Sequence, residues 1–92
     1  KKGGNTMVQQ TVVIQNPTGM HTKISAQFVA FTHQFHDEIY LIKGNQKANA
    51  KSLLNLLLLG LDPGSEVTVQ VEGPQEQETL RQVIRYIETL TG

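Results

Sequence analysis

Several features are scarce in this 92-residue sequence, and each absence excludes a class of protein. There is no cysteine, so neither disulfides nor thiolate-bound metals can hold the fold together, which suits a cytoplasmic protein. Eight Lys and Arg balance eight Asp and Glu, so the chain lacks the positive field that drives nucleic-acid binding. The longest apolar stretch, residues 53–59, is interrupted by Asn55 and is far shorter than the roughly 20 residues of a membrane-spanning helix. We therefore expect no nucleic-acid partner and no membrane insertion.

The length allows one compact domain with a single apolar core. Residues 1–6 contain two lysines but no apolar run behind them, so they do not form a secretory signal. We interpret Met7 as the natural start and residues 1–6 as a flexible extension or a cloning remnant. Residues 7–92 then make up the folded domain.

Periodic apolar residues predict seven secondary-structure elements. Apolar residues at every second position, the strand pattern, are clearest in residues 67–71. The helical spacing of four and then three is clear for Ile24, Phe28 and Phe31. The predicted elements are, in chain order, strand 8–14, helix 22–33, strand 38–42, strand 46–49, helix 51–58, strand 67–71 and a last helix over about 76–90. Because the strands show one apolar face, the order β-α-β-β-α-β-α indicates an α+β fold with a four-stranded antiparallel sheet covered on one face by three helices.

His21 differs from the other two histidines in its position. It follows a turn-forming loop that contains Pro17 and Gly19, and it directly precedes the predicted helix 22–33. The first amide groups of a helix have no partner within the helix, and the helix dipole favours an anion there. A neutral imidazole can accept a phosphoryl group near pH 7, and Lys23 could add positive charge. The position is compatible with a phosphoryl acceptor, but an ordinary capping or surface histidine is more common at such a site, so position alone does not decide the role.

Two segments carry a more specific pattern. Residues 16–28, which contain His21, resemble the active-centre segment of HPr, the phosphocarrier family of the bacterial phosphotransferase system, where the usual pattern is Gly-Leu-His-Ala-Arg-Pro-Ala. Residues 49–54 and 58–61 resemble the serine-containing helix of the same family. The resemblance covers about residues 7–90 and implies an open-faced β-sandwich of the predicted element order. Residues 7–92 are therefore expected to be an HPr-like phosphocarrier domain.

The resemblance also implies a function for His21. Enzyme I, charged from phosphoenolpyruvate, would phosphorylate His21 on Nδ1, and the phosphoryl group would pass to a sugar-specific enzyme IIA in sugar uptake. The backbone amides of Thr22 and Lys23 would hold the phosphate, and the Lys23 side chain would stabilise it. The chain would be a phosphorylated intermediate rather than an enzyme, acting as a monomer without a cofactor.

Three residues beside His21 depart from the family pattern. Lys23 stands in place of Arg, Ile24 in place of Pro, and Thr22 in place of a small residue that is often Ala. Lysine keeps the positive charge but lacks the planar guanidinium that binds phosphate through two donors. The loss of proline removes a residue pre-set for the first helical turn. We expect these changes to slow transfer or alter partner choice rather than abolish phosphorylation.

Ser52 matches a position that a dedicated serine kinase phosphorylates in HPr proteins of many Gram-positive bacteria. The resemblance makes it a candidate regulatory site, through which the chain could bind a transcription regulator. The alternative is that Ser52 serves only as the N-cap of the second helix, because serine is a favoured cap. The sequence leaves both roles open.

The Leu-rich segment 53–58 contains more leucines than one side of a short helix can bury. Some of them should form an exposed apolar docking patch near His21, because the family binds its partners through this helix and the first one. The predicted partner-binding residues are Met20, Thr22, Leu53, Leu54 and Leu57.

No metal site is predicted. His33 and His36 are three residues apart, but they lie on either side of a predicted helix end and have no further ligand nearby.

Two other functions fit the same sequence. The first is a regulatory HPr-like module, of the nitrogen branch or phosphorylated on Ser52, that binds target proteins and transfers phosphate poorly. The second keeps only the architecture and uses the patch at 53–58 as a general interaction surface.

Overall fold

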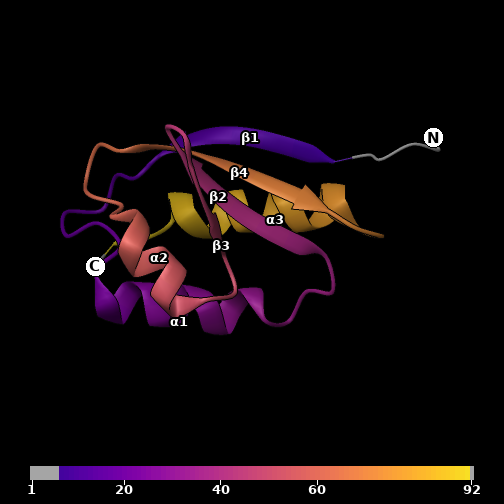
Figure 1. Ribbon diagram of the computed structural model, residues 1–92, viewed down its shortest axis with the longest axis horizontal. Helices are drawn as coiled ribbons and strands as arrows, with labels where there is room; N and C mark the ends of the chain where they lie inside the picture. Colours follow the sequence, from indigo (N-terminus) through magenta and orange to yellow (C-terminus); the bar gives the residue numbers. More distant parts are fainter. Residues whose placement is uncertain (1–6, 92) are drawn as a thin grey trace.

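The computed structural model describes residues 7–91, and the interpretation of residues 1–6 lies outside this range. Four strands form one antiparallel sheet in the order β1-β4-β2-β3 (Figure 1). The strands are β1 (Val8–Val13), β2 (Glu38–Lys43), β3 (Gln46–Asn49) and β4 (Glu66–Glu72). The central strand β4 pairs with both β1 and β2, so the first strand of the chain lies at one edge of the sheet and β3 lies at the other.

Three helices lie on one side of this sheet (Figure 1). They are α1 (Thr22–Thr32), α2 (Leu53–Leu59) and α3 (Glu76–Glu88). Helix α3 packs on β1 and β4, whereas α2 packs on β3 and on α1. No helix within residues 7–91 has the length and apolar character needed to cross a membrane.

The core lies between the sheet and the helices. Alternate side chains of β4, those of Val67, Val69 and Val71, are fully buried, and so is Phe28 of α1. On the opposite face of the sheet most side chains are polar, and the hydroxyl groups of Thr11 and Thr68 hydrogen-bond to one another across strands β1 and β4 at 2.9 Å. One buried face under the helices and one uncovered, mostly polar face confirm the predicted open-faced sandwich.

The order and type of all seven predicted elements are confirmed. Most boundaries agree within one residue, and the largest differences are at the start of the second helix and at the end of the last one. The second helix was predicted from Lys51 but begins at Leu53. Ser52 has extended backbone angles, and its Oγ accepts a hydrogen bond from the Asn55 amide, so it precedes the helix as its N-cap. At the end of α3, Thr89 caps the helix, and Leu90 packs against the core from beyond it.

Candidate functional site

The loop before α1 is held firmly against the segment that follows α2. Asn16 Nδ2 donates to the Gly19 carbonyl at 2.8 Å, and the Met20 amide donates to the Leu61 carbonyl at 2.8 Å. Gly19 has a φ of +66°, and a Cβ at this position would lie 2.6 Å from the Leu61 carbonyl oxygen. Only glycine fits such a close approach with this backbone conformation. These contacts therefore fix the position at which the loop ends and α1 begins.

His21 is the N-cap of α1 and is exposed. Its backbone is extended, with φ −75° and ψ −172°, and its Nδ1 accepts a hydrogen bond from the Lys23 amide at 3.3 Å. A ring nitrogen that accepts a hydrogen bond presents a lone pair, and the proton of the neutral ring is then on Nε2. The helix thus begins with a solvent-accessible imidazole whose Nδ1 lone pair faces the amides of the first turn.

A groove of about 420 Å³ joins His21 to the end of α3. Lys23 lies on the same side of this groove as His21, whereas Tyr86, Thr89 and Leu90 come from the end of α3. Burial raises the pKa of Tyr86, whose ring stacks on that of Phe31 of α1 with centroids 4.2 Å apart. Sequence reasoning missed this second wall, because no local signal marks residues more than 60 positions from His21 as its neighbours.

The structure brings His21 and Lys23 together and places Thr22 beside them as the first residue of α1. Both Thr22 and Lys23 are exposed. The amide of Lys23 donates to Nδ1 of the imidazole. Sequence reasoning included Asn16 only among the turn formers of the loop and did not predict its side-chain bond to the Gly19 carbonyl.

The predicted partner surface is exposed only in part. Leu54 and Leu57 are 65% and 38% exposed, Leu58 is 73% exposed, and Leu53 is half-buried. The prediction for the Met20 side chain is wrong, because it packs into the core and only 4% of its surface is exposed. We define the exposed leucine patch as Leu54, Leu57 and Leu58.

Ser52, at the start of the same helix, is half-buried and has the expected N-cap geometry.

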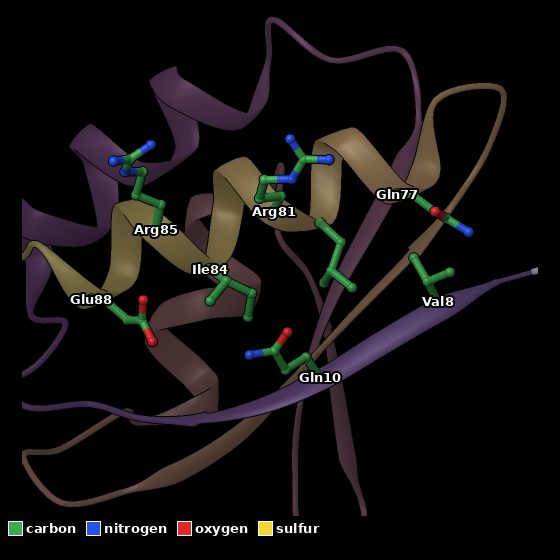
Figure 2. A pocket seen from close by; sticks show the side chains of 8 residues that line it. Val8, Gln10, Gln77, Arg81, Ile84, Arg85 and Glu88 are labelled. Atoms are coloured by element: carbon green, nitrogen blue, oxygen red, sulfur yellow. The ribbon is translucent and has the colours of Figure 1, made fainter.

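A second groove, of about 610 Å³, lies between β1 and α3 (Figure 2). Gln10 of the edge strand points toward Ile84 of the helix, whereas the Arg85 side chain points away from the strand (Figure 2). Arg81 forms an ion pair with Glu78 one turn earlier, at 3.0 Å. No histidine and no predicted site residue lines this groove, so its size alone does not make it the site.

Metal ligands do not cluster in the part of the chain that the structure describes, where no group of three or more suitable side chains is found. His33 Nε2 instead lies 3.0 Å from the Lys51 carbonyl oxygen, and the geometry makes it a donor to that oxygen. This contact ties the end of α1 to the segment before α2.

Comparison with known proteins places these features in a family. A family model described as the PTS HPr component phosphorylation site matches residues 8–89. The HPr-like protein Crh of Bacillus subtilis (strain 168) is 37% identical over 82 residues, which cover 89% of this chain and 96% of Crh. Phosphocarrier protein HPr of Vibrio cholerae is 36% identical over 84 residues, which cover 91% of this chain and 99% of the relative. The crystal structure of a phosphocarrier protein HPr from Bacillus anthracis matches with a TM-score of 0.85 and 32% identity, covering 89% of this chain and 98% of that one.

The family match includes both His21 and Ser52 and extends from β1 to the cap of α3. Relatives in the family are named phosphocarrier proteins rather than enzymes, which agrees with a chain that carries a phosphoryl group instead of turning over a substrate. The architecture, the capping histidine and the near-complete coverage agree with one another. This chain belongs to the HPr family of phosphocarrier proteins of the phosphotransferase system.

Proposed function

We propose that this chain is a cytoplasmic phosphoryl carrier that accepts phosphate from enzyme I on His21 and passes it to a sugar-specific enzyme IIA. The observation that carries the proposal is the position of His21 Nδ1 at the N-terminus of α1, facing the Lys23 amide at 3.3 Å. An exposed nucleophilic nitrogen at a helix N-terminus combines access for a donor protein with a site that favours the negatively charged product.

The chemistry follows from the lone pair on Nδ1. It attacks the phosphorus of the donor, a bond forms between Nδ1 and phosphorus, and the bond between phosphorus and the donor breaks. The Lys23 amide then loses the ring nitrogen as its acceptor and gains a phosphoryl oxygen. Because the amides of Thr22 and Lys23 are already at the helix start, they bind the new charge without rearrangement of the helix.

The Lys23 side chain contributes a second, weaker form of stabilisation. It lines the same groove as His21 and is exposed, so its ammonium group can approach the phosphoryl group. An ammonium group binds phosphate as a point charge and lacks the paired donors of arginine. We therefore expect transfer to be slower here than in relatives with arginine at this position.

The partner proteins would dock on α1 and α2 together. These helices pack against each other, and the exposed leucine patch lies on α2. Leu54 and Leu57, with half-buried Leu53 and exposed Thr22, supply apolar area at the place where enzyme I and enzyme IIA would bind. The same face would serve donor and acceptor in turn, since both must reach His21.

Labelled phosphoenolpyruvate and enzyme I test this function directly. The intact chain should acquire an acid-labile, base-stable label that His21→Ala removes. The matched control is His36→Ala, because His36 is also exposed but lies beyond the end of α1. Sugar-type and nitrogen-type enzyme I should be tested side by side, and the faster donor identifies the branch that the chain serves. No label on the wild-type chain from either donor would defeat the proposal.

The similarity to Crh supports a second candidate, a regulatory HPr-like module that transfers phosphate poorly. Ser52 is the N-cap of α2, and a phosphate on its Oγ would lie next to the positive end of that helix. In this role a serine kinase would modify Ser52, and the phosphorylated chain would bind a transcription regulator.

Kinase assays separate the two candidates. The regulatory role predicts an acid-stable label on Ser52 that Ser52→Ala removes, together with slow transfer from His21 to enzyme IIA. Rapid relay to enzyme IIA with no modification of Ser52 would exclude it.

A further inference from the structure

Ser25 is a fully buried polar residue one turn into α1, and it contacts both peptide groups that flank His21. Its Oγ donates a hydrogen bond to the Met20 carbonyl at 2.7 Å. Its amide donates to the His21 carbonyl at 2.8 Å. One side chain and its own backbone thus hold the carbonyl groups on either side of the His21 Cα.

These two hydrogen bonds restrict the two backbone rotations of His21. The Met20 carbonyl belongs to the peptide plane before His21, and the His21 carbonyl belongs to the plane after it. Fixing both planes fixes φ and ψ of His21, which are −75° and −172°. The direction of the imidazole depends on these angles, so they also determine whether Nδ1 meets the Lys23 amide.

We propose that Ser25 is a positioning residue for phosphorylation of His21, an inference that rests on the proposed carrier function. The usual family segment has Pro-Ala where this chain has Ile24-Ser25. A proline at the third helical position fixes φ and needs no partner for a backbone amide, whereas isoleucine does not fix φ. The Ser25 hydroxyl supplies a restraint that alanine cannot, and so takes over part of the role of the missing proline.

Thr32 provides a matched comparison on the same helix. Thr32 lies at the far end of α1 and is also fully buried, and its hydroxyl shares one proton between the carbonyls of Val29 and Ala50, at 3.0 and 2.8 Å. If buried hydroxyls on α1 act only through stability, removal of either one should have the same effect on phosphorylation. If Ser25 positions His21, only its removal should slow the reaction of folded protein.

The experiment compares wild type, Ser25→Ala, Thr32→Val and the double variant Ile24→Pro with Ser25→Ala. Initial rates of His21 phosphorylation by enzyme I are measured over a range of chain concentrations at a temperature where circular dichroism shows every variant folded. We expect Ser25→Ala to lower kcat about tenfold with little change in KM, because it misplaces the nucleophile without altering the docking surface. Thr32→Val should keep the wild-type rate, and Ile24→Pro should restore most of the rate lost in Ser25→Ala.

A second measurement does not depend on phosphorylation. Hydrogen exchange of the Lys23 amide reports its bond to His21 in the unphosphorylated chain, and protection should fall in Ser25→Ala but not in Thr32→Val. If wild type accepts no phosphate, the carrier function fails while this exchange result still tests the positioning role. Equal rates and equal Lys23 protection in Ser25→Ala and Thr32→Val would overturn the inference. Failure of a folded double variant to recover would overturn the part assigned to proline.

Discussion

Helices α1 and α3 begin in contrasting ways. The N-cap of α1 is the exposed His21, whose ring nitrogen lies 3.3 Å from the Lys23 amide. The N-cap of α3, Gln75, makes no side-chain capping bond, and the buried carboxylate of Asp37 replaces it. Asp37 accepts hydrogen bonds from the Gln75 amide, at 3.0 Å, and from the Thr79 hydroxyl.

The two helix starts differ in whether the group that accepts the hydrogen bond is buried or open to solvent. At the start of α3 a buried carboxylate already accepts two hydrogen bonds and places a negative charge beside the positive end of the helix, which disfavours a second anion there. The bond at the start of α1 is longer, and its acceptor belongs to an exposed side chain, so it is more easily exchanged. In the proposed carrier function, this weak cap allows a phosphoryl oxygen to replace the ring nitrogen as the acceptor of the Lys23 amide.

The largest expected effect on stability comes from Asp37→Ala. Removing this buried carboxylate leaves the Gln75 amide and the Thr79 hydroxyl without their acceptor, so the free energy of unfolding should fall by about 3 kcal/mol. Urea titration measures the loss, and the exposed Glu66→Ala is the control, expected within about 0.5 kcal/mol of wild type. Phosphorylation of the folded variant should stay normal. A normal unfolding midpoint would show that Asp37 is not what stabilises α3.

A smaller loss in the free energy of unfolding is expected from Gly19→Ala, which disturbs the loop directly before His21. Gly19 and Gly44 both have positive φ, but only at Gly19 would a Cβ meet the backbone, at 2.6 Å from Leu61 O. Both variants incur a cost of about 1 kcal/mol for a left-handed alanine, and Gly19→Ala should lose about 1 kcal/mol more than Gly44→Ala because of the clash. It should also slow phosphorylation, which Gly44→Ala should not. Equal losses of stability would contradict the close packing described for the loop.

His21→Ser should abolish phosphorylation without destabilising the fold. Serine is a better N-cap than histidine, so the free energy of unfolding should stay the same or rise by about 0.5 kcal/mol. Thermal and urea unfolding of the two proteins provide the measurement. A loss of more than about 1 kcal/mol would mean that His21 stabilises α1 substantially, and the contrast with Asp37 would then fail.

The parts of the fold that could be predicted are those with local signals. Alternating valines in residues 67–71 and the stripe of Ile24, Phe28 and Phe31 identified a strand and a helix because burial follows their period. The start of α2 was misplaced at Lys51, since good helix formers precede the cap and only the geometry of Ser52 shows where the helix begins.

The candidate site was predictable along the chain but not across space. His21 and Lys23 are near one another in sequence, and a turn signal and a family pattern both mark them. Asp37 and Tyr86 act through contacts with distant residues, for which a single sequence has no signal. Met20 was misjudged for the same reason, because its burial depends on packing with residues far along the chain.

The smallest expected effect on stability concerns the stacking of Tyr86 of α3 on Phe31 of α1. Burial raises the pKa of Tyr86 above its ordinary value of 10.0, so the folded chain holds this proton to a higher pH than the unfolded chain does. The contribution of neutral Tyr86 to the free energy of unfolding is therefore fully present below the pKa of unfolded tyrosine. It is lost as the pH rises through the higher pKa of the folded chain. A hydrogen bond to Glu38 likewise raises the pKa of Tyr40, so wild type should lose stability from both groups.

Urea midpoints between about pH 8 and about pH 11 for wild type, Tyr86→Phe and Tyr40→Phe separate the two contributions. Tyr86→Phe should lose less stability with rising pH than wild type, because phenylalanine keeps the stacking on Phe31 and cannot ionise. Phosphorylation at neutral pH should be unchanged in Tyr40→Phe, which lies away from the groove. If Tyr86→Phe has the same alkaline slope as wild type, the α1–α3 contact does not depend on a neutral Tyr86. The stability of the groove wall opposite His21 must then come from its apolar neighbours alone.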